Sequence, residues 1–170
     1  MAEPLPELNR GVLPSQAIRA MIAQGAIRAD GAPEEQIQPA SLDLRLGSTA
    51  YRVRASFLTG AGRTVADRLT EFAMHEIDLT KGAVLEVGCV YVVPLQEYLA
   101  LPADVSAVAN AKSSTGRLDL FTRLITDQGT EFDRIEAGYE GPLYAEISPR
   151  TFSVLVRPGA RLNQIRFRRG

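Results

Sequence analysis

Residues 134–150 read RIEAGYEGPLYAEISPR, a glycine-rich turn followed by a regular alternation of apolar and polar side chains. Successive side chains of a strand point to opposite faces, so apolar residues at every second position mark a strand with one face in the core. Here those residues are Leu143, Ala145 and Ile147. Tyr144 and Glu146 fall on the other face. The segment therefore predicts a half-buried β-strand.

Further segments after residue 40 have the same short, strand-like character, with turn residues between them. They are SLDLRL (41–46), YRVRASF (51–57), AVLEVG (83–88), CVYVVPL (89–95), VSAVAN (105–110), LDLFTRLI (118–125), FSVLVR (152–157) and LNQIRF (162–167). With 14 Gly and 10 Pro, this spacing is typical of a mainly β sandwich or barrel. We expect the Pro158-Gly159 turn to close a hairpin between the last two segments.

One helix is expected before these strands. Ser15 suits its N-cap and Gly25 its C′ position, and apolar residues lie between them at helical spacing: Ala17, Ile18, Met21 and Ile22. The segment RTVADRLTEFAMHEI (63–77) fits either a short second helix or a long loop. The length of 170 residues fits one domain, residues 1–170.

Composition excludes several classes of protein. The net charge of −1 argues against broad nucleic-acid binding, and no apolar run reaches the roughly 18 residues of a membrane span. Because the start MAEPLPELNR is polar and acidic, we expect it not to be a signal peptide. Cys89 is the single cysteine, which favours a reducing, cytoplasmic setting. With His75 as the single histidine and no CxxC motif, we expect no zinc site.

The segment KSSTGR (112–117) places hydroxyl side chains and a glycine between two cations. It lacks the order of a Walker A loop. Even so, hydroxyls and backbone N–H groups in a turn can cradle phosphate, and Lys112 and Arg117 add positive charge. A solvated turn whose hydroxyls cap their own backbone is an equally good interpretation of the composition.

Glu146 is the candidate for acid–base chemistry. A carboxylate on a rigid strand, with Tyr144 two residues away as a shield, suits a general base. The alternative is an exposed glutamate on a sheet surface. Glu136 and Tyr139 lie in the preceding glycine-rich turn, where a sugar could approach closely. Asp43, in SLDLRL, falls on the polar side of what we expect to be an ordinary half-buried strand.

Several segments, taken in order, resemble the dCTP deaminase branch of the dUTPase-like superfamily. They are the leading helix with Gly25-Ala26-Ile27, then PASLDLRLG (39–47), KSSTGRLDLF (112–121), RIEAGYEGPLYAEI (134–147) and VLVRPGARLNQIRF (154–167). The resemblance covers nearly the whole chain. It implies a dUTPase-like β-barrel or jelly roll, assembled as a homotrimer with sites between subunits, and a deamination step that needs no metal. It is also compatible with the N-terminal half of a longer, two-domain member.

The resemblance implies a role for each site residue. Glu146 would be the general base for a water that attacks C4 of the cytosine of dCTP, and Ser113 and Arg117 would position that water and Glu146. The triphosphate, carrying Mg²⁺, would be held by Lys112, Ser113, Ser114, Thr115, Gly116 and Arg117. Glu136 would hold the sugar 3′-hydroxyl, with Tyr139 beside it. Tyr144, Ala145 and Glu146 would read the pyrimidine through their main chain.

Three functions remain open at this point. The first is hydrolytic deamination of dCTP to dUTP and ammonia. The second is dUTP cleavage, alone or added to deamination, for which only Glu136 matches, at a position where the family has Asp. The third is a non-catalytic, nucleotide-binding or structural trimer domain. The placement of Glu146 favours the first.

Overall fold

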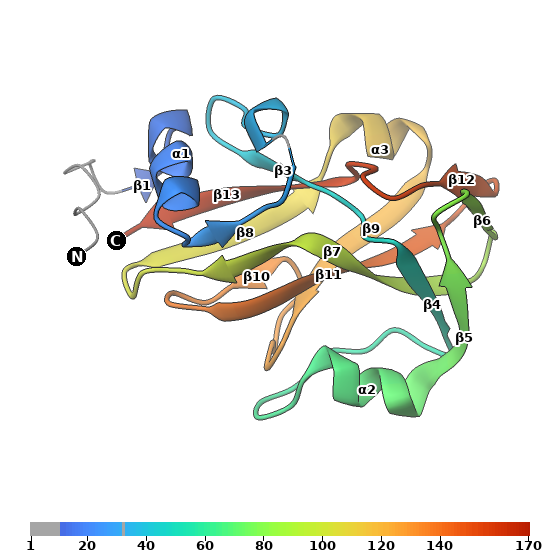
Figure 1. Ribbon diagram of the computed structural model, residues 1–170. Helices are drawn as coiled ribbons and strands as arrows, with labels where there is room; N and C mark the ends of the chain where they lie inside the picture. Colours follow the sequence, from blue (N-terminus) through green and yellow to red (C-terminus); the bar gives the residue numbers. More distant parts are fainter. Residues whose placement is uncertain (1–10, 32) are drawn as a thin grey trace.

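The computed structural model describes residues 11–31 and 33–170, and these form a mainly β structure (Figure 1). Its helices are α1 Ser15–Ala23, α2 Val65–Phe72 and α3 Ser113–Arg117, with a 3₁₀ turn at Pro33–Glu35. Its strands are β1 Gly11–Val12, β2 Ile27–Arg28, β3 Leu42–Leu44, β4 Thr49–Val53, β5 Ala73–Asp78, β6 Ala83–Leu85, β7 Val90–Ala100, β8 Val105–Ala111, β9 Leu120–Thr126, β10 Arg134–Ile135, β11 Glu140–Pro149, β12 Val154–Val156 and β13 Asn163–Arg169. The mainly β prediction is confirmed.

Two antiparallel sheets and one short strand pair make up the architecture. One sheet has the order β1-β13-β8-β10, with β3 also paired to β13. The other has the order β5-β4-β7-β11-β9, with β2 also paired to β7, and β12 pairs with β6. The main core takes residues from both sheets, including Leu99 on β7, Leu143 on β11 and Phe167 on β13. Leu143 thus packs in the main core, whereas Ala145 and Ile147, on the same face of the strand, pack in a second core cluster with residues of β6 and β12.

The first helix follows the prediction except at its start. Ala17, Ile18 and Met21 are fully buried. The N-cap is Pro14 rather than Ser15, and no side chain caps the helix there. Gly25 has a φ of +80°, which is the left-handed conformation that ends many helices.

The predicted hairpin at Pro158-Gly159 is wrong. A turn does form, because the N–H of Ala160 bonds to the carbonyl of Arg157 at 3.2 Å. The strands on either side then separate: β12 pairs with β6, whereas β13 pairs with β1, β3 and β8. The turn passes the chain from one sheet to another instead of folding it back on itself.

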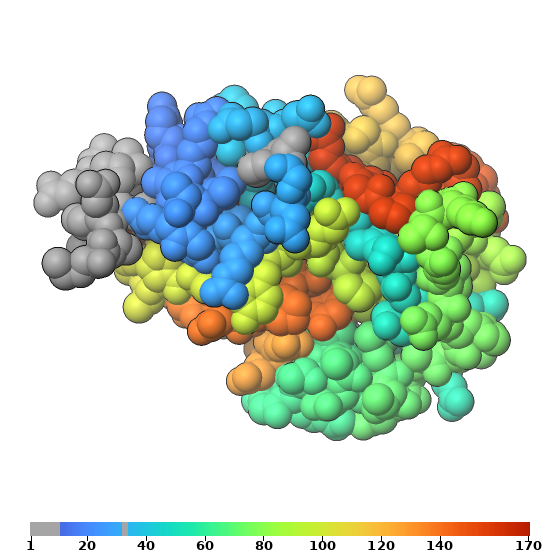
Figure 2. All heavy atoms as spheres, in the orientation of Figure 1, coloured from blue at the N-terminus to red at the C-terminus, as the bar shows by residue number. Residues whose placement is uncertain are grey.

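The segment 63–77 contains a helix and not a long loop. The Thr64 side chain accepts a hydrogen bond from the N–H of Asp67, and the Asp67 side chain accepts one from the N–H of Thr64. This reciprocal arrangement is a capping box. Val65 and Leu69 then pack on the outer face of the second sheet, against Val92 and other apolar residues. In Figure 2 the green α2 segment forms the lower lobe of the visible face.

We expect Thr64→Ala to lower the free energy of unfolding by about 1 kcal/mol, because it removes the acceptor that starts α2. Urea denaturation followed by circular dichroism measures this change. Thr70→Ala is the matched control, since the hydroxyl of Thr70 bonds only to the carbonyl of Asp67 within the helix. Equal stability of the two variants would contradict a capping role for Thr64.

Candidate active site

Glu146 lies on β11, an inner strand between β7 and β9. In these two pairings it is opposite Val92 and Arg123. Its side chain projects from the outer face of the sheet, yet the residue is only 2% exposed. Arg123 on β9 and Ser56, in the segment between β4 and α2, contact its carboxylate. The alternative of an exposed surface glutamate is therefore wrong.

Both carboxylate oxygens of Glu146 have partners within the chain. Nε of Arg123 lies 2.5 Å from Oε2, and the hydroxyl of Ser56 donates to Oε1. Arg123 also reaches the Ser56 hydroxyl, at 3.3 Å. The guanidinium is packed against aromatic rings, 3.5 Å from the ring centroid of Phe132 and 5.2 Å from that of Phe121. These three side chains form a closed polar triad on the sheet.

Arg123 and Ser56 were not among the residues predicted from the sequence. Arg123 is in phase with Phe121 on β9, but its position beside Glu146 follows from the pairing of β9 with β11. Ser56 lies 90 residues from Glu146, in a segment with no recognisable motif. Only the tertiary structure reveals these contacts.

A cavity of about 500 Å³ opens beside Glu146. Its lining includes Ser56, Phe121, Arg123, Ser148 and Arg150. Arg150 stacks on Phe121, with its Cζ 4.8 Å from the ring centroid. The cavity thus offers an aromatic ring, the Arg150 guanidinium and a carboxylate that is paired with Arg123, which suits a polar ligand.

In the segment 112–117, which was predicted to bind phosphate, some side chains point into the protein and the others point to the surface. Nζ of Lys112 lies 2.5 Å from Oδ2 of Asp43, and the buried Thr115 hydroxyl donates to the carbonyl of Leu162 at 2.8 Å. These two side chains hold α3 in place, which differs from the phosphate contacts predicted for them. Ser113, Ser114, Gly116 and Arg117 are exposed.

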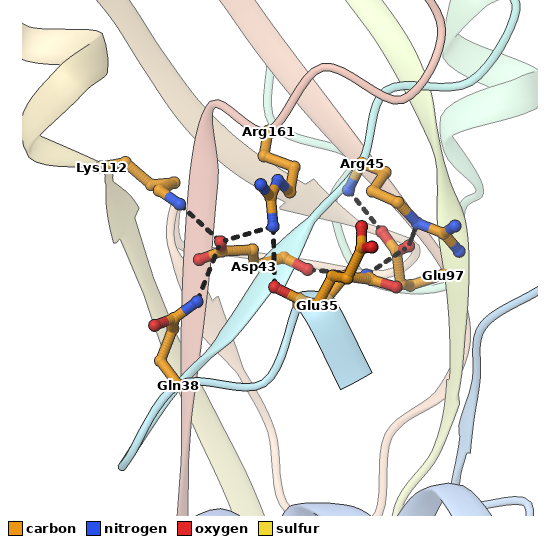
Figure 3. Close-up of polar contacts among 8 residues, drawn as sticks. Glu35, Gln38, Asp43, Arg45, Glu97, Lys112 and Arg161 are labelled. Carbon is orange, nitrogen blue, oxygen red and sulfur yellow. Dashed lines mark hydrogen bonds and ion pairs between the residues drawn. The ribbon is translucent and has the colours of Figure 1, made fainter. Parts of the chain in front are cut away.

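Asp43 is the largest departure from the sequence analysis. The strand was expected to be half-buried, but Asp43 is fully buried. Figure 3 shows its carboxylate between Lys112, Arg161 and Gln38. Its Oδ2 lies 3.4 Å from Nη1 of Arg161 and 3.5 Å from the Gln38 amide nitrogen. Asp43 thereby joins β3, the start of α3 and the turn before β13.

A second buried pair lies next to Asp43 in Figure 3. Glu97 accepts from the N–H and from Nε of Arg45, at 2.7 and 2.9 Å, and from the side chain of Gln36 at 3.2 Å. Burial raises the pKa of Glu97, and the Arg45 contacts oppose this shift. The polar side of SLDLRL is therefore an internal network.

Glu136 and Tyr139 line a separate cavity of about 300 Å³, with Asp127 and Arg134 among its other residues. The Tyr139 hydroxyl accepts from the N–H of Asp127 at 3.0 Å and donates to the carbonyl of Pro142 at 2.7 Å. Burial raises the pKa of Tyr139. Its hydroxyl is thus committed to the backbone, and Glu136 remains exposed for a ligand.

Tyr144 and Ala145 are held firmly in β11. Ala145 is paired with Val93 on β7 and with Leu124 on β9. Because the strand has a partner on each side, this arrangement argues against main-chain reading of a base by residues 144–146. Tyr144 packs with the α2 cluster, and burial raises its pKa to about 12.

Within one chain, the site residues predicted from the sequence lie at three separate locations. Glu146 faces the 500 Å³ cavity, Glu136 and Tyr139 face the 300 Å³ cavity, and α3 lies on the surface. No hydrogen bond or ion pair within residues 11–31 and 33–170 joins Ser113 or Arg117 to Glu146. In the same residues there is no cluster of three His, Cys, Asp or Glu that could hold a metal, and no helix long and apolar enough to cross a membrane.

Comparison with known proteins gives consistent matches. Residues 9–170 match the family described as 2′-deoxycytidine 5′-triphosphate deaminase N-terminal domain. The chain is 33% identical over 159 residues to a "dCTP deaminase, dUMP-forming" of Parafrankia sp., covering 91% of this chain and 74% of the relative. It is 28% identical over 159 residues to an enzyme of the same name from Sulfurihydrogenibium sp., covering 92% and 82%.

A solved structure is also similar. The crystal structure of 2′-deoxycytidine 5′-triphosphate deaminase from Agrobacterium tumefaciens superposes with a TM-score of 0.93 at 62% identity. The match covers 96% of this chain and 49% of the Agrobacterium chain. The chain thus spans about half the length of that protein.

Proposed function

This chain belongs to the 2′-deoxycytidine 5′-triphosphate deaminase family, whose N-terminal domain it matches over residues 9–170, and on that premise we propose that it deaminates dCTP to dUTP and ammonia. The family expected from the sequence is confirmed. The observation that carries the proposal is the position of Glu146, a buried carboxylate on a rigid strand beside a polar cavity. This is the arrangement that general acid–base chemistry needs.

The chemistry assigned to Glu146 is a pair of proton transfers. A water oxygen bonds to C4 of the cytosine while Glu146 accepts a proton from that water and delivers it to N3. Glu146 then carries the proton of the new C4 hydroxyl to the amino group, the C4–N bond breaks, and ammonia leaves. The base becomes uracil, with a carbonyl at C4 and a proton on N3, and Glu146 ends unprotonated. A single carboxylate suffices for both transfers.

The exposed part of α3 would contact the triphosphate. Ser113, Ser114 and Arg117 are free on the surface, whereas Lys112 and Thr115 anchor the turn from within. Because this turn and Glu146 are apart in one chain, we propose a homotrimer in which α3 of one copy faces Glu146 of another. Mg²⁺, a hard cation that takes oxygen ligands, would arrive on the triphosphate.

We expect Arg117→Ala to weaken dCTP binding and lower turnover, because it removes an exposed guanidinium that can contact two phosphate oxygens. The unfolding midpoint should not change, since Arg117 has no ion pair within residues 11–31 and 33–170. Thr115→Ala should instead lower the unfolding midpoint, because it removes the bond from the buried Thr115 hydroxyl to the carbonyl of Leu162. Calorimetric titration with dCTP and thermal melts measure both. Unaltered dCTP affinity in Arg117→Ala would contradict a role for α3.

Cleavage of dUTP to dUMP is the second candidate activity. It is favoured by the names of the two relatives, which are called dUMP-forming, and by Glu136 at the mouth of the 300 Å³ cavity. A carboxylate there could activate water for attack on the α-phosphate. A non-catalytic nucleotide-binding domain is the third. We place the activity in the cytoplasm, where one unpaired cysteine stays reduced.

One assay separates these functions. The protein is incubated with dCTP and, separately, with dUTP, in the presence of Mg²⁺, and ammonia and pyrophosphate are followed together. Release of ammonia from dCTP, without pyrophosphate from either substrate, supports deamination as the one activity. Release of ammonia from dCTP together with pyrophosphate from both substrates adds dUTP cleavage. Pyrophosphate from dUTP without ammonia from dCTP would replace deamination with dUTP cleavage. Binding of dCTP without either product would assign a non-catalytic role.

A further inference from the structure

We propose that Arg123 is a positioning residue for Glu146, which holds the carboxylate through Oε2 and leaves Oε1 as the oxygen that exchanges the proton. This inference rests on the proposed deamination. It starts from the ion pair, in which Nε of Arg123 lies 2.5 Å from Oε2 of Glu146. The Arg123 side chain is 25% exposed and that of Glu146 is 3% exposed. At this burial a charge pair is screened less by water than on the surface.

The guanidinium is fixed in direction as well as in place. Cζ of Arg123 lies 3.5 Å from the ring centroid of Phe132 and 5.2 Å from that of Phe121. Rings that hold a guanidinium in this way add a cation–π attraction and restrict its rotation. Nη2 of the same guanidinium donates to the Ser56 hydroxyl at 3.3 Å. Arg123 is therefore ordered before any substrate binds, as a positioning group must be.

Within the described part of the chain, the other charged groups near Glu146 do not contact its carboxylate, and Arg117 would approach it from another copy in the proposed trimer. Arg150 lines the same cavity but stacks on Phe121. Asp133 accepts from the N–H of Leu124 at 2.7 Å, and burial raises the pKa of Asp133, with the charge of Glu146 adding to the shift. On the β7 side Glu146 faces Val92, which carries no charge. Arg123 is thus the cation in direct contact with the carboxylate in the described part of the chain.

The two oxygens of Glu146 have different partners, and this difference assigns their roles. Oε2 bonds to an arginine, which does not lose its proton in proteins. Oε1 bonds to the Ser56 hydroxyl, which can rotate and accept as well as donate. Oε1 is therefore the oxygen that can release its partner and take a proton from water. Once it is protonated, loss of the ion pair favours delivery of that proton to the base.

Arg123→Gln tests the role of the charge. We expect kcat for ammonia release to fall about 10- to 100-fold, with KM for dCTP changed far less, because the ground-state contacts of the nucleotide remain. The acidic limb of the kcat profile should move to higher pH, because a carboxylate binds protons more readily when the cation in contact with it is removed. A residue that only stabilises the fold would leave that limb in place.

Two further variants keep the test decisive. Arg169→Gln breaks a similar pair, in which Nε lies 2.7 Å from a carboxylate oxygen of Asp104 on the surface, and should keep the wild-type profile. Arg123→Lys keeps the charge without the planar fork, so it should keep the acidic limb but lower kcat. If Arg123→Gln does not fold, wild-type kcat in Arg123→Lys overturns the proposal.

A direct titration separates this inference from the proposed function. The side-chain carboxyl carbon of Glu146 is followed by NMR across the pH range in wild type, Arg123→Gln and Arg123→Lys, and is assigned through Glu146→Gln. Failure of wild type to release ammonia would refute deamination, while the titration still decides what Arg123 does. Arg123→Met, which also removes the charge, replaces Arg123→Gln if that variant does not fold. If the titration curve of Glu146 in the folded variant is identical to that in wild type, the proposed role of Arg123 is overturned.

Discussion

Glu146→Gln should lower the rate of ammonia release from dCTP by about two to four orders of magnitude, the usual contribution of a general acid–base group. Glutamine has the same shape and still accepts from Ser56, but it cannot take the proton of the attacking water. Affinity for dCTP should stay close to that of wild type, because the nucleotide contacts are retained. Stopped assays for ammonia and calorimetric titration measure the two quantities.

The replacement also removes the charge opposite Arg123, so folding must be measured with activity. Glu71→Gln is the control, since it makes the same chemical change at an exposed glutamate of α2 that pairs with Arg63 and Arg68. It should leave turnover unchanged. If Glu146→Gln is folded and releases ammonia at the wild-type rate, the mechanism proposed for Glu146 is refuted.

The features predicted correctly from the sequence are those that depend on neighbours along the chain. The alternation in residues 143–147 follows from local strand geometry, and the structure buries all three apolar residues. The helical spacing of Ala17, Ile18 and Met21 is equally local. Glu146 was placed on the correct face of its strand for the same reason.

The features that were missed depend on contacts between distant segments. A Pro-Gly pair indicates a turn, but not which sheet edges remain free, so β12 and β13 pair with other strands. The burial of Glu146 needs the segment before α2, which reaches it from 90 residues away through Ser56. An alternating pattern such as SLDLRL also cannot reveal that its polar face meets cations from two distant turns.

Asp43→Ala should lower the free energy of unfolding by about 3 to 5 kcal/mol, the cost of breaking a buried ion pair from one side. Asp43 is 0% exposed, and its loss leaves Lys112 and Arg161 without their shared anion. The Lys112 side chain is 23% exposed, so part of its charge can recover hydration and the lower part of the range is expected. Urea denaturation provides the measurement.

Asp43→Asn separates charge from shape. It keeps the volume and one carbonyl oxygen for Lys112, so it should destabilise less than alanine. Asp104→Ala breaks the exposed pair with Arg169, and its unfolding midpoint should match wild type, as is usual for surface pairs. If Asp43→Ala unfolds at the same urea concentration as Asp104→Ala, the network does not stabilise the fold.

The same variants link this network to the proposed site, because Lys112 is the residue from which α3 begins. When Asp43 is lost, the Lys112 side chain loses its ion pair, and the start of α3 is held by bonds from the Lys112 N–H and the Thr115 hydroxyl to the carbonyl of Leu162, at 2.9 and 2.8 Å. Ser113, Ser114 and Arg117 should then become less ordered, and dCTP affinity should fall in the folded fraction of Asp43→Ala. Titration at low temperature, where the variant is folded, measures this. Wild-type affinity there would show that the triphosphate does not depend on the orientation of α3.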